Sequence, residues 1–204
     1  MNVDGKLYVC FPGGFPVELL GSVIEAGVDV VQLRMKDAEA REIIEIAGQF
    51  AHVCRDLGVP FIVNDRPDVA FALKADGVHL GQDDLPPPVA REIVGPDTII
   101  GRSTHSASDI ECAIAEHAGG CADYIAVGPI NETPTKPGRP AVGLELIEHA
   151  AATVDLPWFA IGGIDTTNVD QVVKAGASRI VVVRAITQAD DPVDAAKRLR
   201  DALP

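Results

Sequence analysis

Aromatic residues are scarce in this chain of 204 residues, at one Trp, two Tyr and six Phe. Apolar residues nevertheless make up 47% of the sequence, so the hydrophobic core must be built mainly from Val, Ile, Leu and Ala. An aliphatic core of this kind is typical of parallel strands that are buried beneath helices.

Long apolar runs and paired cysteines are also absent. No run of about 18 apolar residues occurs, and the first six residues lack the apolar segment of a signal peptide, so we expect neither a membrane span nor export. The cysteines form no CxxC pair and have no histidine at zinc-finger spacing. They are Cys10, Cys54, Cys112 and Cys121. We expect reduced, mostly buried thiols in a cytoplasmic protein.

Basic residues are few, with 17 Lys and Arg against 30 Asp and Glu, which gives a net charge of −13. This balance disfavours nucleic acid and anionic membrane surfaces as partners. An anionic substrate would therefore have to be held by locally clustered cations or by a metal ion. The sequence leaves open whether the protein forms a homo-oligomer.

Short apolar segments alternate with amphipathic segments along the whole chain. The predicted strands cover residues 7–11, 30–34, 61–64, 77–80, 99–103, 124–128, 159–162 and 179–183. The predicted helices cover residues 17–26, 38–57, 67–74, 86–93, 107–118, 143–152, 167–175 and 192–203. This alternation predicts an α/β fold, a (β/α)8 TIM barrel. No linker divides residues 1–204, so we expect one domain. The alternative is an open doubly wound sheet, but no GxGxxG motif follows the first strand.

In such barrels the functional groups lie at the carboxyl ends of the strands. The most distinctive loop follows the sixth strand and reads GPINETPTKPG over residues 128–138. Its prolines stiffen the backbone, and Thr133, Thr135 and Lys136 supply hydrogen-bond donors for an anion. The alternative is a solvated loop that binds nothing.

Two aspartates, Asp65 and Asp84, follow the neighbouring third and fourth strands. Their carboxylates can converge on one point, and Mg²⁺ usually takes only one or two protein carboxylates. The sequence therefore predicts a magnesium site, with a pair of ordinary helix N-caps as the alternative.

Three polar residues alternate with apolar ones at the end of the second strand: Gln32, Arg34 and Lys36. Because side chains alternate along a strand, we expect all three to share one face beside the metal site. Arg34 and Lys36 would then help to neutralise a diphosphate. The alternative is a surface ion pair with Asp37 or Glu39.

A second anion site is predicted on the other side of the barrel. Gly162 and Gly163 follow the seventh strand, where backbone amides can approach a ligand closely, and Val183 and Arg184 follow the eighth. Two separated anion sites suit the joining of two phosphorylated substrates. His105, which follows Ser103 and Thr104, is an acid/base candidate or a helix-start residue. His79 is expected to be packed.

The motifs at these strand ends resemble those of the thiamine-phosphate synthase family over nearly the full length of the chain. They are VQLRMK (31–36), ND (64–65), GVHLGQDD (77–84), STHS (103–106), GPINETPTK (128–136) and IGGI (161–164). Members of this family are (β/α)8 barrels that couple 4-amino-2-methyl-5-hydroxymethylpyrimidine diphosphate to a thiazole phosphate. The resemblance implies a dissociative mechanism in which diphosphate leaves before the thiazole nitrogen attacks.

The resemblance also implies roles for individual residues. Those expected to bind the pyrimidine diphosphate are Gln32, Arg34, Lys36, Asn64, Ser103 and Lys136. Catalysis is expected to depend on Arg34, Lys36, Ser103 and Lys136, and the Mg²⁺ ligands would be Asp65 and Asp84. The thiazole phosphate would contact Thr133, Pro134, Thr135, Gly163, Val183 and Arg184.

Arg184 departs from the family pattern, which commonly has serine at this place. It either adds a cation to the phosphate site or pairs with Asp190 or Asp191. Two other functions stay open: a thiazole tautomerase-type isomerase, which needs a proton-transfer residue but no metal, and a non-catalytic barrel that binds thiamine precursors.

Overall fold

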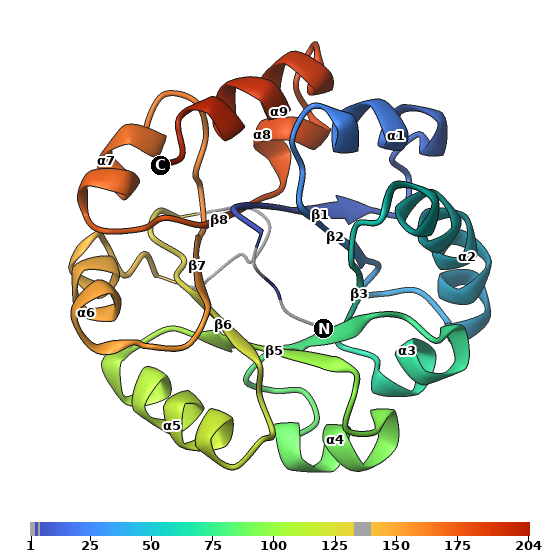
Figure 1. Ribbon diagram of the computed structural model, residues 1–204, viewed down its shortest axis with the longest axis horizontal. Coiled ribbons are helices and arrows are strands. Elements are labelled where there is room, and N and C mark those ends of the chain that lie inside the picture. Colours follow the sequence, from blue (N-terminus) through green and yellow to red (C-terminus); the bar gives the residue numbers. More distant parts are fainter. Residues whose placement is uncertain (1–2, 4, 133–139) are drawn as a thin grey trace.

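Eight parallel strands close into a barrel in which each strand pairs with the next along the chain and β8 pairs with β1 (Figure 1). The computed structural model describes residue 3, residues 5–132 and residues 140–204. The strands are β1 Leu7–Pro12, β2 Val30–Arg34, β3 Phe61–Asn64, β4 Gly77–Leu80, β5 Ile99–Thr104, β6 Tyr124–Val127, β7 Trp158–Ile161 and β8 Ile180–Val182. The predicted fold class is confirmed, and every predicted strand end lies within one residue of the observed end.

The helices form a ring around the strands (Figure 1). They are α1 Val17–Glu25, α2 Ala40–Leu57, α3 Pro67–Leu73, α4 Pro87–Val94, α5 Ala107–Ala118, α6 Glu145–Thr153, α7 Val169–Lys174, α8 Arg184–Thr187 and α9 Pro192–Asp201. The sequence did not predict α8, because its four residues are too few to show a helical period. The Asp191 side chain caps α9, and Gly58 ends α2 in the left-handed conformation.

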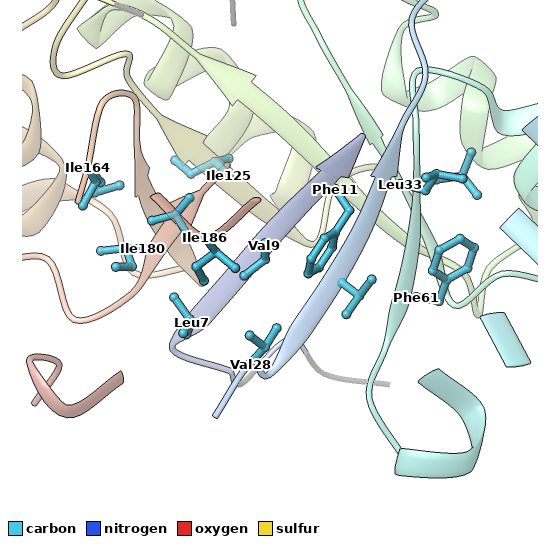
Figure 2. Packing of buried hydrophobic residues seen from close by; sticks show 14 of the residues in the cluster. Leu7, Val9, Phe11, Val28, Leu33, Phe61, Ile125, Ile164, Ile180 and Ile186 are labelled. Carbon is cyan, nitrogen blue, oxygen red and sulfur yellow. The ribbon is translucent and has the colours of Figure 1, made fainter. Parts of the chain in front are cut away.

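Each strand divides its side chains between two cores, because successive residues point to opposite faces. On β1, Leu7, Val9 and Phe11 point outward and pack under the helices (Figure 2). Tyr8 and Cys10 belong instead to the smaller cluster inside the barrel.

Three of the scarce aromatic residues meet inside the barrel. Tyr8, Tyr124 and Phe159 meet edge to face, with ring centroids 5.4 to 6.0 Å apart. Such pairs add to the stability that burial alone provides. Large rings therefore fill much of the barrel centre, whereas the surrounding core is mainly aliphatic and includes four phenylalanines.

Aspartates tie neighbouring strands together at the amino-terminal end of the barrel. Asp29, which precedes β2, accepts a hydrogen bond from the Leu7 amide of β1 at 3.0 Å. Asp76 and Asp123, which precede β4 and β6, accept from the amides of Phe61 and Ile100 at 2.8 and 2.7 Å. Each carboxylate satisfies a backbone donor of the preceding strand and so helps to fix the register of one strand pair.

All four cysteines carry free thiols. Cys10 and Cys54 are buried, whereas Cys112 is exposed and Cys121 is intermediate, so the expectation of mostly buried thiols holds for only two. Burial raises the pKa of the Cys54 thiol to about 12. Among the described residues, no helix is both long enough and apolar enough to cross a membrane.

Asp123 offers a direct test of these carboxylate contacts. Asp123→Ala removes the acceptor of the Ile100 amide and the partner of Arg91, whose Nη2 lies 2.7 Å from the carboxylate. We expect the free energy of unfolding to fall by about 1–3 kcal/mol, and by less in Asp123→Asn, which keeps an acceptor oxygen. Urea unfolding measures both, with Glu111→Ala on the exposed face of α5 as the control. An Asp123→Ala protein as stable as the control would contradict this role.

Candidate functional site

A cavity of about 550 Å³ opens at the carboxyl ends of the strands. Many of the residues predicted from the sequence line it, and they come from strands on all sides of the barrel. These are Gln32, Arg34, Asn64, Ser103, Gly163, Val183 and Arg184. The structure therefore brings residues of both predicted anion sites to one cavity.

Several predicted residues lie elsewhere. Lys36 is exposed and borders a separate shallow depression that it shares with Arg34. Asp65 and Asp84 are not among the described residues that line the cavity. Thr133, Pro134, Thr135 and Lys136 lie outside the part of the chain that the structure describes.

The carboxylates of Asp65 and Asp84 lie close together beside Arg34. Burial, a hydrogen bond to Asp84 and the charge of Asp84 together raise the pKa of Asp65 to about 6, against the lowering effects of Arg34 and Asn64. Asp84 Oδ2 also accepts a hydrogen bond from the Gly81 amide at 2.7 Å. A half-buried pair of carboxylates whose joint ionisation is penalised fits a hard divalent cation such as Mg²⁺.

The alternative role of these aspartates as helix caps is not what the structure shows. The N-cap residues of α3 and α4 are Arg66 and Pro86, and neither helix has a side-chain cap. Asp65 itself adopts a left-handed backbone conformation with φ of 61°. Aspartate tolerates this conformation better than most residues, so the turn that presents the carboxylate suits its sequence.

Sequence reasoning missed Arg102, whose guanidinium anchors the loop that carries Asp84. Its Nη1 donates to the Gly81 carbonyl at 2.5 Å, and its Nη2 donates to Gln82 Oε1 at 3.2 Å. On the other side, Arg102 Nε lies 3.7 Å from Glu116 of α5. The loop is thereby fixed to β5 and α5. The sequence signal would have been an arginine on the helix-facing side of a strand.

Sequence reasoning also missed the polar side chains deep in the barrel, where Tyr8, Tyr124 and His79 connect Gln32 to Ser103. Gln32 Nε2 donates to the Tyr8 hydroxyl at 2.5 Å, and the two tyrosine hydroxyls lie 2.9 Å apart. His79 Nδ1 is 3.0 Å from the Tyr124 hydroxyl, and its Nε2 is 3.0 Å from Ser103 Oγ. His79 is packed, as expected, but it also lines the cavity. The sequence signal that could have revealed them is the alternation of side chains along the first strand, which places Tyr8 inside the barrel.

The glycine turn after β7 forms the opposite wall of the cavity. Gly162 and Gly163 have φ of 108° and 65°, a region that favours glycine. A Cβ atom on Gly162 would also overlap the backbone of Pro129. Asn168 Nδ2 donates to the Gly163 carbonyl at 2.7 Å and holds the turn in place. Val183 is the N-cap of α8, and Arg184 is its first residue.

His105 lines the same cavity, and its ring is fixed by a contact between Nδ1 and the Gly128 carbonyl. Its backbone amide donates to Asp109 Oδ2 at 2.8 Å. The residue is therefore held at the start of α5, as the helix-start interpretation expects. A direct chemical role for it stays a prediction.

These features define a class of protein: a (β/α)8 barrel with one polar cavity at the carboxyl ends of its strands, flanked by an acidic pair and a glycine turn. Enzymes of this architecture bind their substrates at that end of the barrel.

Comparison with known proteins identifies the family within this class. The model of the family described as thiamine monophosphate synthase matches residues 7–186. The thiamine-phosphate synthase of Acidothermus cellulolyticus is 51% identical over 199 residues, which cover 95% of this chain and 92% of that protein. The chain belongs to the thiamine monophosphate synthase family.

Solved structures agree. A thiamine phosphate pyrophosphorylase from Pyrococcus furiosus superposes with a TM-score of 0.85 at 36% identity, covering 97% of this chain and 94% of that one. A 3-hexulose-6-phosphate synthase superposes with a TM-score of 0.69 at 21% identity, covering 98% and 100% of the two chains, and so shares the fold alone.

The raised pKa of Asp65 leads to a stability prediction. An aspartate has an ordinary pKa of 3.8, and folded Asp65 has about 6, so the folded protein binds this proton more tightly than the unfolded chain. The stability that this proton provides is present below about pH 4 and is lost as the pH rises through 6. Asn tolerates the left-handed conformation and carries no charge. In EDTA, Asp65→Asn should therefore raise the Tm at pH 8 by about 2–4 °C, the shift for 1 kcal/mol in a domain of this size, with little change at pH 4.

Scanning calorimetry at both pH values checks this expectation. Asp68→Asn serves as a control that should lower the Tm at pH 8, because the hydrogen bond from Arg66 lowers the pKa of Asp68 and so favours its ionised form. A Tm of Asp65→Asn at or below that of the wild type at pH 8 would show that the two carboxylates do not oppose each other.

Proposed function

We propose that this protein is a thiamine-phosphate synthase, a transferase that couples 4-amino-2-methyl-5-hydroxymethylpyrimidine diphosphate to a thiazole phosphate and releases pyrophosphate. The observation that carries the proposal is the single cavity in which Gln32, Asn64 and Ser103 face the glycine turn at Gly163. Two anionic substrates that meet in one cavity can react with each other, in a chain that belongs to this family.

The pyrimidine diphosphate occupies the side of the cavity formed by β2 to β5. Gln32 and Asn64 offer amide groups, Ser103 a hydroxyl and Arg34 a guanidinium. Lys36, at the edge of this region, and Lys136, on the loop after β6, complete the cationic surroundings of the diphosphate. The acidic pair of Asp65 and Asp84 would hold Mg²⁺, which supplies charge neutralisation to the leaving diphosphate when bound.

The thiazole phosphate occupies the opposite side. The glycine turn at Gly163 and the start of α8 at Val183 present backbone amides, and Arg184 adds a guanidinium. Barrels of this kind frequently bind phosphate at the loops after strands seven and eight. Thr133, Pro134 and Thr135, which follow β6 in the sequence, are further proposed contacts of the thiazole phosphate.

The reaction needs charge stabilisation and not a strong base. The bond between the pyrimidine methylene carbon and the diphosphate oxygen breaks first, and the thiazole nitrogen then forms a bond to that carbon. Negative charge grows on the departing diphosphate, so Arg34, Lys36, Ser103 and Lys136 stabilise the transition state by donating hydrogen bonds to its oxygens. Fixed groups in a partly enclosed cavity do this better than water.

Two alternatives compete with this function. A tautomerase would use His105, which lines the cavity, but would not need the acidic pair. A non-catalytic barrel would need the cavity but not the cations around a leaving group. We further propose a single domain over residues 1–204, two phosphorylated small molecules as partners and a cytoplasmic location, which the four free thiols support.

Mixing the two substrates separates these alternatives. The synthase should release one pyrophosphate for each thiamine phosphate formed, and excess EDTA should abolish the reaction until Mg²⁺ is restored. A pyrophosphate assay and chromatography of the product measure both. Turnover that is undiminished in EDTA would contradict the proposed role of the metal. Mixtures in which no thiamine phosphate forms would contradict the proposed synthase activity.

Arg184 tests the second anion site. If its guanidinium contacts the thiazole phosphate, Arg184→Ser should raise the KM for that substrate by about tenfold to a hundredfold, the range for a lost charge-assisted hydrogen bond. The KM for the pyrimidine diphosphate should change little. Arg198→Ser on the exposed face of α9 controls for the loss of one positive charge. An unchanged KM in Arg184→Ser would leave the backbone amides as the phosphate donors.

A further inference from the structure

Five buried polar side chains form an unbroken line across the inside of the barrel. They come from five strands and are almost fully excluded from solvent: Gln32 2%, Tyr8 1%, Tyr124 0%, His79 7% and Ser103 4% exposed. Every link between neighbours is 2.5 to 3.0 Å long. Both ends of the line, Gln32 and Ser103, lie in the wall of the cavity.

The hydrogens in this line can be assigned by counting donors and acceptors. The amide nitrogen of Gln32 cannot accept, so it donates to the Tyr8 oxygen. Tyr8 then gives its own hydrogen to Tyr124, and Tyr124 gives its hydrogen to His79 Nδ1. The histidine hydrogen is therefore on Nε2, where it is donated to Ser103 Oγ.

The opposite direction leaves a hydrogen unsatisfied. If Tyr124 donated to Tyr8, the Tyr8 oxygen would accept from both neighbours, and its own hydrogen would have no acceptor among the contacts of the described residues. A buried donor without a partner is costly. Neither tyrosine can avoid this by ionising, because burial raises the pKa of both hydroxyls.

Two neighbours hold the line in this arrangement. The Cys10 thiol donates to Gln32 Oε1 at 3.2 Å, which orients the amide with its nitrogen toward Tyr8. Gly101 of β5 lies beside the contact between Tyr124 and His79, and a Cβ atom there would overlap both side chains. The absence of a side chain at this position is what lets the two rings approach each other.

We propose that Tyr8, Tyr124 and His79 are positioning residues that form a one-way hydrogen-bond relay from Gln32 to Ser103 and fix Ser103 as a donor toward the ligand. Because Ser103 Oγ accepts from His79, its own hydrogen is directed away from the relay and into the cavity. Diphosphate oxygens only accept hydrogen bonds, so this direction is the one that the substrate requires. The significance for catalysis rests on the proposed function, whereas the direction of the relay does not.

Nitrogen NMR of the ¹⁵N-histidine-labelled, ligand-free protein tests the direction without any activity measurement. The signals of His79 are assigned by their loss in His79→Gln. We expect a neutral ring with the hydrogen on Nε2 and none on Nδ1. A hydrogen on Nδ1, alone or together with one on Nε2, would overturn the relay.

Kinetics test the consequence for Ser103. His79→Leu removes both contacts and should lower kcat/KM for the pyrimidine diphosphate by about tenfold or more. His79→Gln, whose amide can accept from Tyr124 and donate to Ser103, should recover most of the loss. In a Ser103→Ala background, His79→Leu should lower kcat/KM by less than about twofold, because the effects of two residues that act through one another are not additive. An undiminished effect in that background would show that His79 does not act through Ser103.

Two further variants separate the relay from packing. Phe159→Leu disturbs the same aromatic layer, in which the Phe159 ring centroid lies 5.4 Å from that of Tyr8 and 5.7 Å from that of Tyr124, and should keep the Nε2 hydrogen of His79.

If His79→Leu does not fold, Tyr124→Phe, which removes a single oxygen, takes its place in the kinetic series. If the wild type proves to lack synthase activity, the proposed function fails while the NMR result still decides the relay.

Discussion

The alternation of side chains along eight closed parallel strands is the constraint on which the rest of this structure depends. Closure commits every second residue of each strand to the barrel interior, where a polar group that finds no hydrogen-bond partner is costly. The interior of this chain nevertheless contains Gln32 and His79, along with the hydroxyls of two tyrosines. These groups are tolerated because each finds a hydrogen-bond partner on another strand, and the register of the barrel decides which partners meet.

The net charge of −13 sets a second condition, since two anionic substrates must enter a negatively charged protein. The cavity meets this condition locally, with the guanidiniums of Arg34 and Arg184 on different sides. The acidic pair of Asp65 and Asp84 works in the opposite direction, and the proposed Mg²⁺ would offset it. Attraction of the substrates is therefore a property of one end of the barrel and not of the whole surface.

Most of the fold could be predicted from the sequence, because strands buried on both faces appear as short apolar runs and strand ends are marked by glycine, proline and polar residues. The cavity wall was predictable for the same reason: Asn64, Ser103 and Gly163 stand at strand ends. The parts of the site that could not be predicted depend on residues that are neighbours only in the folded structure. Tyr8 resembles any buried aromatic residue until Tyr124, far away in the chain, is placed beside it. Lys36 continues the alternation of Gln32 and Arg34, but β2 ends at Arg34, and the alternation has no meaning beyond the strand.

The aspartates at the amino-terminal end of the barrel give the eight strands a pairwise organisation. Asp29, Asp76 and Asp123 join β1 to β2, β3 to β4 and β5 to β6, whereas the Ala160 amide of β7 is bound by the backbone carbonyl of Arg179 before β8. Three strand pairs thus add to their backbone pairing a side-chain contact that a single mutation can change, whereas the contact between β7 and β8 at this end is made by backbone atoms. That fourth pair carries the glycine turn and α8. The half of the cavity proposed to receive the thiazole phosphate therefore stands on a strand pair whose contact at the opposite end does not depend on an aspartate side chain.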